Sequence, residues 1–94
     1  MKITAQVQML GAVDRRHYGE TEYRRRQVVV SWRDEEHPDA VIMESLCLTL
    51  NDELADKPLV ENMFYVFDVH CYVDMFNGRM FNKFNVKSIE TPQP

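Results

Sequence analysis

Apolar and polar residues alternate strictly at the start of the chain. A repeat of two residues is typical of a β-strand that buries one of its faces. The alternation therefore predicts a first strand over residues 1–9, and the side chains expected to face the core are Met1, Ile3, Ala5, Val7 and Met9.

The next segment is polar and charged, and Gly11 and Gly19 interrupt it, so residues 11–22 are expected to form a loop. A second strand is expected to begin around Tyr23 and to reach Trp32. Its β-branched run, Val28–Val30, followed by an aromatic residue favours a strand over a helix.

A third strand is expected after an acidic turn. The turn covers residues 34–39 and contains a proline, which breaks regular structure. The strand covers residues 41–50, and its alternation directs Leu46, Leu48 and Leu50 to the core.

A short helix is expected directly after this third strand. Asn51 or Asp52 can cap its first turn, where acidic residues suit the helix dipole. Pro58 limits its length, because proline cannot continue a helix interior.

The last part of the chain reads as a long β-hairpin. A fourth strand is expected over residues 63–75, and its more apolar face consists of Tyr65, Phe67, Val69, Cys71, Val73 and Met75. Asn77–Gly78 is a strong hairpin signal, because both residues tolerate a positive φ. A fifth strand returns over residues 79–89, and the polar, proline-rich residues 91–94 form a frayed tail.

Five strands with a short helix between the third and the fourth give the order β-β-β-α-β-β. In a chain of 94 residues, this order predicts an all-β class and a single domain over residues 1–90, folded as a five-stranded Greek-key barrel of the OB-fold type. An SH3-like barrel or a small antiparallel sandwich is the alternative, and the helix argues against both.

The net charge of −4 is distributed unevenly along the chain. Residues 1–33 carry a net charge of +4, residues 34–74 a net charge of −10, and residues 75–94 a net charge of +2. Such asymmetry is compatible with a basic binding zone opposite an acidic surface, and equally with ordinary surface variation.

The sequence contains no long apolar run that would suggest a membrane span and no apolar block of a signal peptide, so we expect a cytoplasmic protein. In that reducing compartment, Cys47 and Cys71 are expected to be free, buried or half-buried thiols. The histidines have no metal-ligand spacing, and no nucleophile or phosphate-loop motif is present, so we expect neither an enzyme nor a cofactor.

The end of the chain resembles a small bacterial family that is known only as a domain of unknown function. The resemblance rests on Phe67–Val69, Phe76–Arg79, Phe81 and Ile89–Glu90. Looser matches are Arg26–Gln27 and Leu46–Cys47–Leu48, whereas Met80 and Lys87 stand where the family usually has tryptophan. The resemblance implies a short OB-fold protein similar to single-stranded DNA-binding proteins, without an established activity.

OB-folds bind ligands on the face of their second and third strands, between the loop that joins strands 1 and 2 and the loop that joins strands 4 and 5. The basic and aromatic residues expected at these places are Arg15, Arg16, Tyr18, Tyr23, Arg24, Arg26, Phe76, Arg79 and Lys83. Cations that follow phosphates and aromatic rings that stack on bases are what single-stranded nucleic acid requires. We therefore expect a non-catalytic module that binds single-stranded DNA or RNA; the alternative is a protein-interaction or self-assembly module. A homodimer fits both.

Overall fold

Six β-strands and one short turn of 3-10 helix make up the fold in a computed structural model, which describes residues 1–32 and 44–92. The elements in chain order are β1 (Lys2–Leu10), β2 (Asp14–Tyr18), β3 (Thr21–Trp32), β4 (Glu44–Asn51), η1 (Asp52–Leu54), β5 (Phe64–Phe76) and β6 (Arg79–Glu90). The fold is therefore all-β, as the alternating pattern predicts. The expected acidic turn at residues 34–39 and the first residues of the expected third strand lie outside the described residues.

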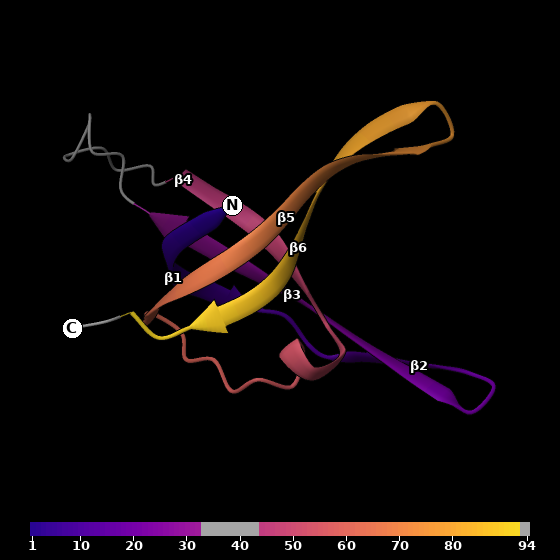
Figure 1. The fold of residues 1–94 in the computed structure, drawn as a ribbon, viewed down its shortest axis with the longest axis horizontal. Helices are drawn as coiled ribbons and strands as arrows, with labels where there is room; N and C mark the ends of the chain where they lie inside the picture. Colours follow the sequence, from indigo (N-terminus) through magenta and orange to yellow (C-terminus); the bar gives the residue numbers. More distant parts are fainter. Residues whose placement is uncertain (33–43, 93–94) are drawn as a thin grey trace.

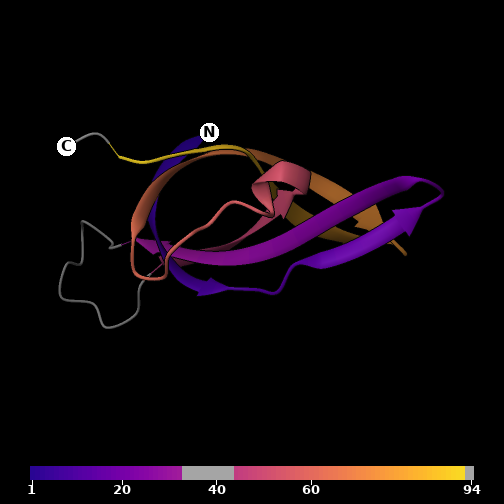
Figure 2. The ribbon, with the colours of Figure 1, turned by 90° about the horizontal axis from the view of Figure 1, so that it is seen from below.

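Five of the strands pair into a closed ring. The sheet order is β1-β5-β6-β4-β3-β2, and an additional pairing between β1 and β3 closes it. Neighbouring strands are antiparallel except β4 and β6, which are parallel and share a single paired position, Thr49 with Asn85. Figure 2 shows the strands curving around a common interior. The strand β2 lies outside this ring and pairs with β3 only, among the described residues.

The closure depends on a bend in β1. Its first half pairs with β5 and its second half with β3, and the pairing register to β3 shifts between Val7 and Met9. A β-bulge of this kind bends the strand and interrupts its alternation. For this reason Ala5 and Val7 are buried, whereas Met9 is exposed. The prediction that Met1 and Met9 face the core is therefore wrong, and Ile3 is half-buried.

The interior of the ring is filled by short apolar side chains and one large ring. The fully buried side chains include Val28, Val30, Leu48, Leu50 and Phe67. The buried leucines of β4 confirm which face of the third strand was expected to point into the core. At ~0.8 kcal/mol per buried methylene, this core is the main stabilising contribution to the fold.

Two β-hairpins extend beyond the ring and dominate the shape of the molecule, whose principal extents are 50 × 37 × 21 Å. One is formed by β2 and the first half of β3, and the other by the second half of β5 and the first half of β6 (Figure 1). Both project from the same side of the ring in this view and diverge toward their tips. We call the second hairpin, residues 70–84, the ribbon.

The first hairpin corrects the expected loop at residues 11–22. The strand β2 occupies part of this segment, and Gly19 with a φ of 65° belongs to the turn that leads into β3. All five side chains of β2 are exposed. A strand with no buried face shows no alternation in its sequence, so the pattern could not reveal it.

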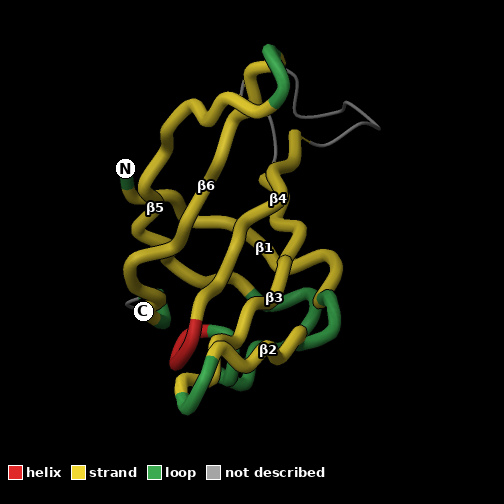
Figure 3. Tube along the Cα trace, turned by 90° about the vertical axis from the view of Figure 1, so that its right-hand side faces the viewer, coloured by secondary structure: helices red, strands yellow, loops and turns green. Residues whose placement is uncertain are grey.

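The ribbon corrects the expected core face of the fourth strand. Phe67 and Val69 are buried as expected, but Cys71, Val73 and Met75 are exposed because β5 continues past the end of the ring (Figure 3). The Asn77–Gly78 hairpin is confirmed, with φ values of 50° and 75°. The expectation of buried or half-buried thiols is wrong, because both cysteines are exposed.

The expected helix between the third and fourth strands is reduced to the three-residue 3-10 helix η1. The connection then follows the open end of the ring, where Ala55 and Leu59 are buried. The ammonium group of Lys57 donates a hydrogen bond to the carbonyl oxygen of Ile89 at 2.8 Å and ties this connection to β6. Thr91 and Pro92 follow β6 without regular structure. Within the described residues, no helix has the length and apolar character that crossing a membrane requires.

Candidate functional site

A groove with a volume of about 390 Å³ lies between the outer surface of the ring and the ribbon. Its floor consists of outward-facing side chains of β3 and β4, because the alternate positions of both strands point into the core. Two cross-strand pairs form the floor: Arg25 opposite Asn51, and Gln27 opposite Thr49. Cys47 continues the floor toward the start of β4.

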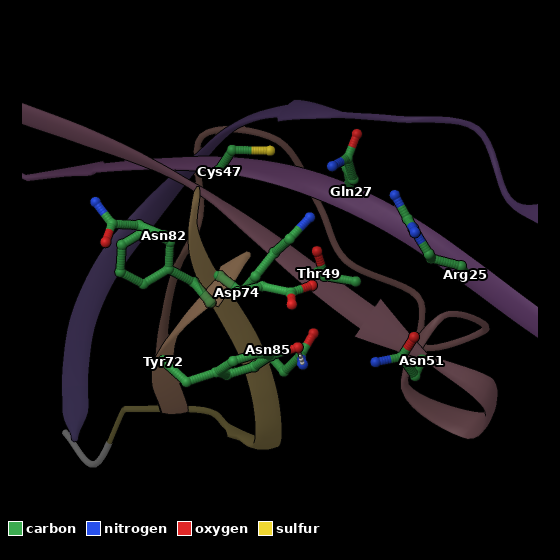
Figure 4. Close-up of a pocket in the computed structure, with 11 residues that line it drawn as sticks. Arg25, Gln27, Cys47, Thr49, Asn51, Tyr72, Asp74, Asn82 and Asn85 are labelled. Carbon is green, nitrogen blue, oxygen red and sulfur yellow. Dashed lines mark hydrogen bonds between the residues drawn. The ribbon is translucent and has the colours of Figure 1, made fainter. Parts of the chain in front are cut away.

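The wall of the groove is built by β5 and β6 where they leave the ring. Tyr72 and Lys83 are opposite each other on these strands, and both line the groove. The side-chain amide of Asn85 donates a hydrogen bond to the Tyr72 hydroxyl at 2.9 Å, which holds the ring in place. The ring of His70 stacks on the ring of Tyr72, with centroids 5.2 Å apart. Arg25 and Asn51 lie at one end of the groove and Tyr72 at the other (Figure 4).

The groove has room to open because β4 and β6 separate. The two strands share only the pair of Thr49 with Asn85, and beyond it the ribbon turns away from β4. The resulting surface is rich in amide side chains, since Gln27, Asn51 and Asn85 all line it. Amides offer both donors and acceptors, so this surface can form hydrogen bonds with a polar ligand such as a nucleobase.

A second concavity, with a volume of about 280 Å³, adjoins the groove on the first hairpin. It is lined by Asp14, Arg16, Tyr18, Tyr23, Arg24, Arg25, Asn51 and Asp52. The rings of Tyr18 and Tyr23 pack edge to face with centroids 5.6 Å apart. We call this surface the hairpin pocket.

Arg25 connects these surfaces. It lines the groove, the hairpin pocket and a smaller concavity of about 190 Å³ beside Gly11. Its side chain is exposed, and within the described residues it forms no ion pair. A guanidinium group at this junction is available to a ligand that passes from one surface to the other.

The arginines next to Arg25 in the sequence have partners within the protein. Arg24 forms an ion pair with Asp56, and the Arg26 side chain donates a hydrogen bond to the carbonyl oxygen of Gly11 at 2.7 Å. Both lie on the same face of β3 as the buried Val28, so they reach the open end of the ring rather than its outer surface. Alternation along one strand therefore separates Arg25 from its two neighbours.

The arginines of β2 are also paired. Arg15 contacts Glu22 at 2.9 Å and Asp56 at 3.9 Å. Arg16 contacts Asp14 at 3.2 Å. Its interaction with Tyr18, and next the negative charge of Asp14, raise the pKa of the Arg16 guanidinium further above its already high ordinary value. Arg16 is therefore a permanent positive charge in the hairpin pocket.

The structure brings together part of the residue set expected from the sequence. Lys83 lines the groove, and Arg16, Tyr18, Tyr23 and Arg24 line the hairpin pocket. The other four, Arg15, Arg26, Phe76 and Arg79, line neither, and the last two lie at the tip of the ribbon.

Sequence reasoning missed Arg25 and Tyr72. Arg25 was missed because the sequence does not show which face of β3 points into the core: three consecutive valines do not indicate which of them is buried. Tyr72 shares a strand face with Asp68 and His70, and only the departure of the ribbon from the ring brings it to the groove.

Groups of three or more histidine, cysteine or acidic side chains placed to hold a metal ion are absent from the part of the chain that the structure describes. Comparison with known protein-family models and with curated proteins finds no match for this chain. The site is therefore interpreted from its own geometry.

Proposed function

We propose that the protein is an OB-fold module that binds single-stranded nucleic acid along the groove and the hairpin pocket. The order of pairing around the ring supports this fold. If β2 is counted as part of the first connection, the first strand pairs with the second, the second with the third, the third with the fifth, and the fourth with the first. The open face of the second and third strands is where such folds bind oligonucleotides.

The observation that carries the proposal is the convergence of two aromatic-lined concavities on one exposed arginine. A single strand needs a cation for each phosphate that it places in the groove and aromatic rings on which its bases stack. Arg25 and Lys83 supply cations to the groove, and Arg16 supplies one to the hairpin pocket. Tyr72 and Tyr23 supply rings on either side of Arg25.

The charge of this surface sets the expected strength of binding. Its basic side chains, Arg16, Arg24, Arg25 and Lys83, are partly offset by Asp14, Asp52 and Asp74. The protein as a whole carries a net charge of −4, which weakens non-specific attraction to a polyanion. We therefore expect binding that involves only about two or three phosphates, with a slope of log K against log salt of about −2.

Fluorescence anisotropy of labelled oligothymidylate and oligouridylate, measured at several salt concentrations, tests the proposal. Replacing Arg25 with glutamine should weaken binding and reduce the salt slope by about 0.7, the contribution of one phosphate contact on a single strand. The matched control is Arg79→Gln, which makes the same change of charge at the tip of the ribbon. This control should leave both quantities nearly unchanged.

Two substitutions at Tyr72 separate stacking from hydrogen bonding. Tyr72→Ala should cost ~1–3 kcal/mol of binding free energy if a base stacks on the ring. Tyr72→Phe removes only the hydroxyl that accepts the hydrogen bond from Asn85, so most of the affinity should remain. The proposal fails if the wild-type protein shows no salt-sensitive binding to either oligonucleotide, or if Arg79→Gln weakens binding as much as Arg25→Gln.

A further inference from the structure

The outer edge of β5 in the ribbon has no strand beside it in the described part of the chain. The pairing between β1 and β5 ends at Lys2 and Asp68, and two hydrogen bonds between Met1 and Val69 follow. The backbone N–H of Val69 donates to the carbonyl oxygen of Met1 at 2.7 Å, and the ammonium group of Met1 donates to the carbonyl oxygen of Val69 at 3.0 Å. From residue 70 to residue 76, β5 pairs with β6 alone. The ribbon stands away from the ring, so the ring does not cover this edge (Figure 1, Figure 3).

The backbone groups along this edge point outward at every second residue. Because the N–H of Val69 points to the β1 side, those of Cys71, Val73 and Met75 point to the same side. The pairing of Phe76 with Arg79 across the two-residue turn agrees with this assignment, since a two-residue hairpin closes on a hydrogen-bonded pair. Cys71 and Val73 therefore present both their N–H and C=O groups to a further strand. Met75 presents its C=O group, whereas its N–H donates to the carboxylate of Asp74 at 2.9 Å.

The side chains at the same positions form an apolar face. Cys71, Val73 and Met75 lie on one face of the ribbon together with Met80 of β6. Val73 is 63% exposed, Met75 65% and Met80 73%. The groove residues Tyr72 and Asp74 lie on the opposite face, whereas Asn82 and Phe84, which also line the groove, share the face of Val73.

Proteins usually protect a free strand edge. Lysine, proline, a bulge or inward-pointing charge discourages further pairing. Two other free edges are protected in this way. Asp14, Arg15, Arg16 and His17 follow one another along β2, and β6 carries Lys83 where it leaves β4. The β5 edge has no lysine or proline between residues 70 and 76, and its pairing register to β6 is regular there. An exposed two-stranded ribbon is also only marginally stable by itself in water.

We infer that this edge pairs with the same edge of a second copy of the chain, antiparallel and about a two-fold axis at Val73. The free stretch extends from residue 70 to residue 76, and Val73 is its midpoint. A register centred nearer the ring would collide with Met1, which already occupies the backbone of Val69. A register centred nearer the turn would leave part of the edge without a partner.

The side chains that meet in this register are compatible. Val73 faces its own copy at the axis, and Cys71 faces the second copy of Met75. On the other face, Asp74 comes opposite the second copy of Tyr72, so like charges are not directly opposed. The two ribbons then form one four-stranded sheet. An interface of this length buries about 1,000 Å² in total, at the lower limit for specific dimers, so we expect micromolar dimerisation.

Sedimentation equilibrium of charge variants tests the edge. Val73→Lys places two ammonium groups at the axis and should weaken dimerisation at least about tenfold. Met80→Lys places the same charge on the same face, but on β6 and away from the edge, and should leave dimerisation nearly unchanged. Circular dichroism of both variants checks that the ring remains folded.

Cross-linking tests the register independently of charge. In a Cys47→Ser background, Met75→Cys places a thiol opposite the second copy of Cys71, at a Cα separation of about 5.5 Å, which a disulfide can span. Mild oxidation with oxidised glutathione should then give a covalent dimer, whereas Cys71 alone or Met80→Cys should not. A protein that stays monomeric at high concentration overturns the inference. So does dimerisation that Met80→Lys disrupts as strongly as Val73→Lys, because that result indicates packing through the apolar face instead of the edge.

Discussion

Val69 and Val73 occupy the same face of the same strand, yet the structure places them in opposite environments. Val69 lies inside the ring and is 1% exposed, whereas Val73 lies on the ribbon and is 63% exposed. Replacing each with alanine removes the same two methyl groups and the same β-branching. The loss of strand propensity is therefore common to both variants and cancels in the comparison.

The magnitudes follow from burial. Removing two fully buried methyl groups costs ~1.6 kcal/mol of transfer free energy, and the cavity that remains adds about 1 kcal/mol. At Val73 about two thirds of this contribution is absent, because the side chain is already in water. We therefore expect Val69→Ala to lower the free energy of unfolding by about 2 kcal/mol more than Val73→Ala. In a domain of this size, that difference corresponds to ~8–16 °C in Tm.

Urea titration followed by the fluorescence of Trp32, the single tryptophan of the chain, measures both variants. Protein is kept at submicromolar concentration, so that the association inferred above does not contribute to stability. The m-value should be unchanged, since both variants expose a similar surface on unfolding. If the two substitutions destabilise the protein equally, the division of β5 into a ring half and a ribbon half is wrong.

Two further substitutions test glycine positions. Gly11→Ala would place a Cβ atom 2.7 Å from the carbonyl oxygen of Gln27, so we expect a loss of ~1–3 kcal/mol in the free energy of unfolding, measured by urea titration; an unchanged stability would contradict the close approach. Gly78→Ala places a side chain at a φ of 75° and should cost ~1–2 kcal/mol in the turn. Hydrogen exchange should then accelerate in the ribbon and not in the ring, and uniform acceleration would contradict the independence of the ribbon.

The sequence was informative wherever a repeat of two residues coincided with burial. The leucines of β4 and the first half of β5 were placed correctly for this reason. The Asn77–Gly78 turn was equally clear, because few other residue pairs accept two positive φ values. The β2 strand was not foreseen, because none of its side chains is buried.

The candidate site was only partly predictable, for a related reason. The two segments that flank the groove were singled out by their arginines and aromatic residues, but the first was expected to be a loop and not a hairpin. Among the consecutive arginines of β3, however, the sequence pointed to Arg24 and Arg26, whereas Arg25 faces the groove. The valines that follow do not alternate with polar residues. The sequence therefore could not show which side chains of β3 face the core, and this became clear only from the neighbouring strands.

The amino-acid pattern alone indicates the strands other than β2, the side chains that share a face in the regular stretches, and the turn of the last hairpin. These are local properties, set by the geometry of an extended chain and by the φ preferences of a few residues. Which of these faces are covered depends on the packing of the whole chain. Cys71, Val73 and Met75 continue the pattern of Phe67 and Val69, but β1 and the ring end beside Val69. Burial depends on neighbours that are distant in the sequence, so the same alternation builds a core in one half of β5 and an open edge in the other.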